Sequence, residues 1–86
     1  MSNISLGFFC MADANKVALM TNIHEAKDYA LGKIQNFVDS HPSVKPANVI
    51  KARAMVNEAR TITKLTMNIG ALVMAHPSEG LKVLYK

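Results

Sequence analysis

The chain has 86 residues, of which 50% are hydrophobic and 19% are charged, and its formal net charge is +4. This length allows one domain and excludes a separate cofactor domain beside a substrate domain. The apolar fraction excludes an intrinsically disordered tail. We therefore expect a single domain over residues 1–86.

The first part of the chain has the composition of a β-hairpin, which we predict over residues 4–21. Residues 4–11 are rich in aromatic and branched apolar side chains, and residues 16–21 form a second short apolar stretch. Residues 12–15, between them, have the composition of a turn. The alternative is one long helix that is capped by Asp13 and continues to Ser40.

A helix is predicted over residues 22–41, where the apolar period changes to three and four. Asn22 stands three residues before Glu25, which is a variant of the capping box and favours a helix start here over the continuous helix. His41 and Pro42 end the pattern, because proline lacks an N–H and disfavours helical geometry in the residue before it. The apolar face consists of Ile23, Ala26, Ala30, Ile34, Phe37 and Val38.

A second, longer helix is predicted over residues 46–75. Pro46 occupies a first-turn position that proline tolerates, and no other proline follows until Pro77. A short closing strand is predicted over residues 81–86. The predicted fold class is therefore α+β and mostly helical, with an N-terminal hairpin, an antiparallel pair of helices and a C-terminal strand.

The second predicted helix is too long for a compact chain of this size. Thirty residues span about 45 Å, whereas a compact chain of 86 residues has a diameter of roughly 31 Å. The end of the helix that extends past this diameter is apolar and must be shielded from water. Three arrangements would achieve this: a break of the helix near residues 61–63, packing of the hairpin over the helix end, or contact with a second chain. We favour the hairpin together with a second chain, and so predict a homo-oligomer whose interface contains Met67, Ile69, Leu72, Val73 and Met74.

Charge is unevenly distributed along the chain. Residues 1–43 carry three lysines and four acidic residues, a net charge of −1, whereas residues 44–86 carry seven basic and two acidic residues, a net charge of +5. The predicted long helix has an apolar stripe that consists of Met55, Ala59, Ile62, Leu65, Ile69, Leu72 and Val73. Opposite this stripe lies a ridge of polar and basic side chains, which is our candidate partner-binding site: Arg53, Asn57, Arg60 and Lys64. Such a ridge suits phosphates or acidic side chains.

Motifs for catalysis, metal binding or a cofactor are absent from the sequence. It has no C-x-x-C, H-E-x-x-H or G-x-S-x-G pattern, and its single cysteine, Cys10, favours a buried inert thiol. His24 and Asp28 lie four residues apart, a spacing more typical of a surface contact than of an acid–base pair. We expect no enzyme activity, no metal and no cofactor.

The sequence thus predicts a small non-enzymatic interaction protein, such as a regulator, inhibitor or adaptor. We expect it to bind another protein, to form homo-oligomers and to be cytoplasmic, because no stretch approaches the ~20 apolar residues of a membrane span. The alternative is a nucleic-acid-binding protein that uses the basic ridge.

Overall fold

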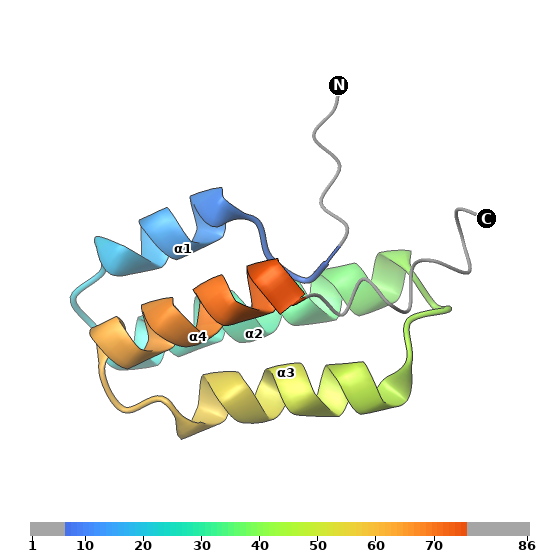
Figure 1. The fold of residues 1–86 in the computed structure, drawn as a ribbon. Helices are drawn as coiled ribbons and strands as arrows, with labels where there is room; N and C mark the ends of the chain where they lie inside the picture. The colour runs from blue at the N-terminus through green and yellow to red at the C-terminus, as the bar shows by residue number, and fades with distance from the viewer. Residues whose placement is uncertain (1–6, 76–86) are drawn as a thin grey trace.

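The computed structural model describes residues 7–75, which form four helices. These are α1 (Met11–Ala18), α2 (Ile23–Ser40), α3 (Pro46–Glu58) and α4 (Ile62–Ala75). Consecutive helices run in opposite directions, and α1 lies beside α4 (Figure 1). Within the described residues the fold is all-helical, so the predicted α+β class is wrong. The predicted strand over residues 81–86 lies outside the described residues.

The predicted hairpin over residues 4–21 is wrong in its described part, where α1 takes its place. Asp13 stands at the third position of α1, and its carboxylate accepts a hydrogen bond from the backbone N–H of Cys10 at 2.9 Å. A carboxylate in the first turn satisfies an orphan N–H and is favoured by the helix dipole. Phe8 and Phe9, which had favoured a strand, are buried in the core instead. Their aromatic character therefore reflects burial rather than strand pairing.

The helix predicted over residues 22–41 corresponds to α2. The Asn22 side chain accepts a hydrogen bond from the Glu25 backbone N–H at 3.0 Å, which is the cap expected from the sequence. The alternative of one continuous helix from Asp13 to Ser40 is also wrong, because α1 ends at Ala18 and α2 begins at Ile23.

The single helix predicted over residues 46–75 is wrong, because the chain breaks between α3 and α4. Ala59 has extended backbone angles, with φ −70° and ψ 134°. Thr61 then caps α4: its hydroxyl accepts a hydrogen bond from the Lys64 backbone N–H at 3.0 Å. The break falls beside the threonine-rich segment that the sequence offered as one of three remedies, and it folds α4 back along α3 (Figure 1).

Helix α4 contacts each of the other three helices and is the centre of the fold. Leu65, Ile69 and Leu72 form its buried stripe. They pack with side chains from every other element, among them Phe8, Val17, Ile34, Phe37, Val49 and Val56. Burial of this stripe stabilises the fold by roughly 1.5–3 kcal/mol for each large side chain.

Candidate functional site

The four residues of the predicted basic ridge do not share one helix. Arg53 and Asn57 lie on α3, Arg60 lies in the connection between α3 and α4, and Lys64 lies in the first turn of α4. All four are exposed, so they remain available to a partner. Because the chain breaks between α3 and α4, these four residues do not form the expected straight ridge. We call the four together the basic set.

Two contacts with α2 fix the orientation of the basic set. The Arg53 guanidinium donates a hydrogen bond from Nη2 to Oε1 of Gln35 at 2.9 Å. The ammonium group of Lys27 donates to the backbone carbonyl of Asn57 at 2.9 Å. Lys27 therefore adds a cation beside Asn57, a contribution that the sequence did not indicate because this lysine lies in the half of the chain with a net charge of −1.

The five residues predicted for the oligomer interface separate into two groups. Ile69 and Leu72 are buried, and Val73 is half-buried against the same core. These three side chains pack in the core of the monomer and are not available to a second chain. Met67 and Met74, in contrast, are 62% and 80% exposed.

The exposed side of α4 around these methionines is weakly charged. Ala71 is exposed and Gly70 is half-buried between Met67 and Met74, and Lys64 is the one charged residue of α4. A Cβ atom added to Gly70 would meet no atom within 4 Å, so the space above this glycine is open. We call Met67, Gly70, Ala71 and Met74 the α4 face.

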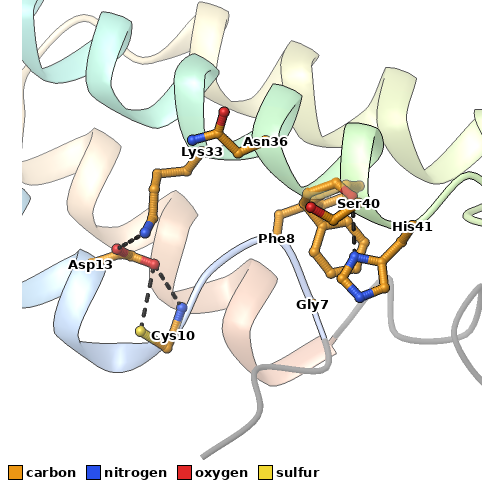
Figure 2. A pocket seen from close by; sticks show the side chains of 9 residues that line it. Gly7, Phe8, Cys10, Asp13, Lys33, Asn36, Ser40 and His41 are labelled. Carbon is orange, nitrogen blue, oxygen red and sulfur yellow. Dashed lines mark hydrogen bonds and ion pairs between the residues drawn. The ribbon is translucent and has the colours of Figure 1, made fainter.

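A polar cluster that was not predicted from the sequence joins α1 to α2 around the buried Asp13. The carboxylate accepts a hydrogen bond from the Tyr29 hydroxyl at 2.7 Å and pairs with the Lys33 ammonium group at 3.4 Å. Cys10 contributes its backbone N–H at 2.9 Å and its thiol at 3.5 Å. The expectation of a buried thiol is wrong, because Cys10 is exposed. Figure 2 shows the contacts to the Asp13 carboxylate from Lys33, on α2, and from Cys10, which precedes α1. Asp13 is thereby held as an anion inside the fold.

These contacts shift the pKa values of both partners. Burial alone would raise the pKa of Asp13, but the hydrogen bonds from Tyr29 and Cys10 and the charge of Lys33 outweigh it and lower the pKa below 3.8. Burial and the Asp13 carboxylate raise the pKa of Tyr29 to about 12. The pair is therefore a carboxylate and a neutral phenol throughout the neutral pH range.

A pocket of about 260 Å³ lies beside this cluster. Phe8 and Phe37 form apolar walls, and the His41 ring stacks on Phe37 with ring centroids 4.2 Å apart. A contact of 3.1 Å joins His41 Nδ1 to the Phe37 backbone carbonyl (Figure 2). The His41 ring is thereby held at the end of α2, and Asp13 is already occupied by its neighbours. This pocket is consequently better explained as packing around a structural carboxylate than as a reaction centre.

A local sequence signal for the cluster did exist. Asp13 follows Cys10 by three residues, and Ala14 and Val17 have helical spacing. This combination is typical of a first helical turn with an acidic third position. The contact with Tyr29 had no such signal, because it joins residues 16 positions apart through tertiary packing.

The remaining candidate residues lie apart from one another on the surface. His24 and Asp28 are both exposed on α2. Across residues 7–75, no group of three or more His, Cys, Asp or Glu side chains is arranged to hold a metal ion. In the same part of the chain, no helix combines the length and the apolar character needed to cross a bilayer. Comparisons with protein-family models, curated protein sequences and solved structures found no significant match.

Proposed function

We propose that this protein is a small non-enzymatic interaction module that pairs with a second copy through α4 and binds another protein through its basic set. A cytoplasmic location, expected from the sequence, is part of this proposal. The observation that carries it is the α4 face, where two large apolar side chains, Met67 and Met74, are mostly exposed. Methionine is common on adaptable binding surfaces, and contiguous exposed apolar side chains mark interaction sites.

The α4 face has the symmetry that a homodimer requires. In a two-fold dimer, if residue i of one copy contacts residue j of the other copy, then residue j of the first copy also contacts residue i of the second. If two α4 helices cross antiparallel at the midpoint between Gly70 and Ala71, each Met67 lies opposite a Met74 of the other copy. The small residues then meet at the centre, where they allow the two backbones to approach closely.

Electrostatics favours a second copy on this face over a charged partner. Lys64, the charged residue of α4, stands one turn before Met67 and outside the four residues of the face. Two copies therefore meet without bringing like charges into the centre of the interface. Arg53 and Asn57 lie on α3 and remain outside the α4 face for the second partner.

Analytical ultracentrifugation of the full chain at micromolar concentrations tests the pairing. We expect a mass near twice the 9.4 kDa of one chain. Met67→Glu and Met74→Glu should each give monomers, because burying an unpaired carboxylate is unfavourable. Leu19→Glu is the matched control: Leu19 is 85% exposed but lies between α1 and α2, so this variant should still dimerise. A wild-type monomer across the whole concentration range would contradict the proposal.

Nucleic acid is the second candidate partner, because Arg60 and Lys64 are both exposed at the α3–α4 connection. Phosphate binding depends steeply on salt because counterions are released. A DNA duplex whose affinity falls steeply between 50 and 200 mM salt, and falls further in Arg60→Glu, would favour this candidate. Binding that hardly changes with salt would favour a protein partner.

A further inference from the structure

A second hollow lies between the end of α2 and the start of α3, beside the connection 41–45. Its volume is about 310 Å³. Six of its lining residues are apolar, and Arg53 is the single charged one; the apolar six are Val38, Pro42, Val44, Pro46, Val49 and Ile50. This volume is at the lower end of the range for small-ligand sites and suits one large side chain.

The walls of this hollow are built to keep their shape. Pro42 and Pro46 have ring-fixed φ angles, and the connection between them is closed by a hydrogen bond from the Val44 N–H to the His41 carbonyl at 3.0 Å. Val44 and Val49 are buried and anchor the floor in the core. A hollow formed before its partner arrives loses little conformational entropy on binding.

The rim of the hollow combines an exposed apolar side chain with a positioned cation. Ile50 is 67% exposed on α3, one helical turn from Arg53. Gln35 accepts a hydrogen bond from Nη2 of Arg53, and Gln35 in turn donates to the Asp39 carboxylate at 2.9 Å. A guanidinium has five N–H donors, so Arg53 keeps others for a partner carboxylate.

The other charges near the rim also favour an acidic partner. Lys45 precedes Pro46 directly, Lys51 follows Ile50, and both are exposed. Asp39 is the opposing carboxylate on the α2 side, and the Gln35 amide already binds it. The two lysines and Arg53 carry three positive charges and Asp39 carries one negative charge, so the rim has a net positive charge.

We infer that this hollow binds an acidic peptide segment of a partner protein, with one bulky apolar side chain seated between Val38 and Ile50 and a neighbouring carboxylate paired with Arg53. This inference rests on the proposed function and specifies the partner chemistry for one end of the basic set. The apolar walls provide the anchor and disfavour nucleic acid, whose charged backbone has no apolar side chain to fill the hollow, whereas the cationic rim selects against basic peptides.

Fluorescence anisotropy with the full chain tests the inference. The probe is a fluorescein-labelled decapeptide with a central phenylalanine, two glutamates on either side of it, and glycine and serine elsewhere. We expect saturable binding that is lost when serine replaces the phenylalanine or when lysines replace the glutamates. Arg53→Glu and Ile50→Glu should weaken binding about tenfold or more. Lys51→Glu is the control: it makes the same charge change beside Ile50, but Lys51 contributes only to the charge near the rim and does not line the hollow, so it should weaken binding only a few-fold.

Three results would overturn the inference. One is equal binding of the serine-substituted peptide, which would mean that charge alone attracts the probe. Another is an equal loss of affinity in Arg53→Glu and Lys51→Glu, and the third is displacement of the probe by a short DNA duplex. If the chain dimerises through the α4 face but does not bind the peptide, the proposed α4 pairing stands and only the inference that the hollow binds an acidic peptide is refuted.

Discussion

The Tyr29 hydroxyl donates a 2.7 Å hydrogen bond to the buried carboxylate of Asp13, and this contact ties α1 to α2. Helix α1 has 8 residues, too few for stability as an isolated helix. Its position against α4 therefore depends on tertiary contacts, and Asp13 also receives the charge of Lys33. Because α1 covers one side of α4, the carboxylate also limits how much of α4 is exposed.

Replacing Tyr29 with phenylalanine should destabilise the fold. The ring stays in place for the Lys16 ammonium group, which lies 4.7 Å from its centroid, so the change removes the hydroxyl alone. Loss of a hydrogen bond to a charged group costs about 1.5–3 kcal/mol. Urea denaturation should show this decrease in the free energy of unfolding, and an unchanged midpoint would mean that water replaces the hydroxyl without loss.

The same pair predicts how stability responds to alkaline pH. The pKa of Tyr29 is about 12 in the folded chain and 10.0 in its reference state, so folding favours the protonated phenol. Its contribution is fully present below pH 10 and is lost as the pH rises towards 12. Tyr85→Phe leaves Tyr29 as the only tyrosine, and its ultraviolet titration should have a midpoint well above 10. A midpoint at 10 would contradict the buried contact.

Asp13 predicts the opposite dependence at acidic pH. Its folded-state pKa lies below 3.8, so the unfolded chain binds the proton more readily. The stabilisation by this carboxylate is present above pH 3.8 and is lost as the pH falls through the folded-state value. Asp13→Asn should cost roughly 1–3 kcal/mol at neutral pH. Urea denaturation at several pH values should show that the difference in the free energy of unfolding between the wild type and Asp13→Asn becomes smaller below pH 4. A difference that stays constant would show that Asp13 does not cause the loss of stability in acid.

Gly32 offers a stabilising change on α2. It is exposed within the helix, and an added Cβ would meet no atom within 4 Å. Alanine is about 0.8–1.0 kcal/mol more favourable than glycine inside a helix. Gly32→Ala should therefore raise the melting temperature by several degrees, and a decrease would show that this part of α2 is not helical in solution.

The sequence predicted α2 well because its signals are local. Asn22 and Glu25 are three residues apart, and the cap they form needs no other element. The long helix failed for a non-local reason: the propensities of residues 59–61 are compatible with helix, but the core is completed only if α4 folds back on α3. The hairpin failed because Phe8 and Phe9 supply aromatic burial, which the composition of a short segment does not distinguish from strand formation.

The candidate site shows the same division. The position of the basic set opposite the apolar stripe predicted that its four side chains are exposed, and the structure places all four on the surface. The interface prediction could not separate Ile69 and Leu72 from Met67 and Met74, because which side of α4 is covered depends on α1. The hollow beside Arg53 depends on the path of the connection 41–45, which carries no periodic pattern.

The central claim, antiparallel pairing of two α4 faces, is tested most directly by disulfide cross-linking. Cys10→Ser removes the single cysteine and places at the N-cap of α1 a residue type that is favoured there. In this background, Met67→Cys chains and Met74→Cys chains of different tag length are mixed in equal amounts, oxidised and separated by mass. We predict that cross-links between Met67→Cys and Met74→Cys chains greatly exceed both same-site products. Same-site cross-links in equal or greater yield, or no cross-link at all, would contradict the account.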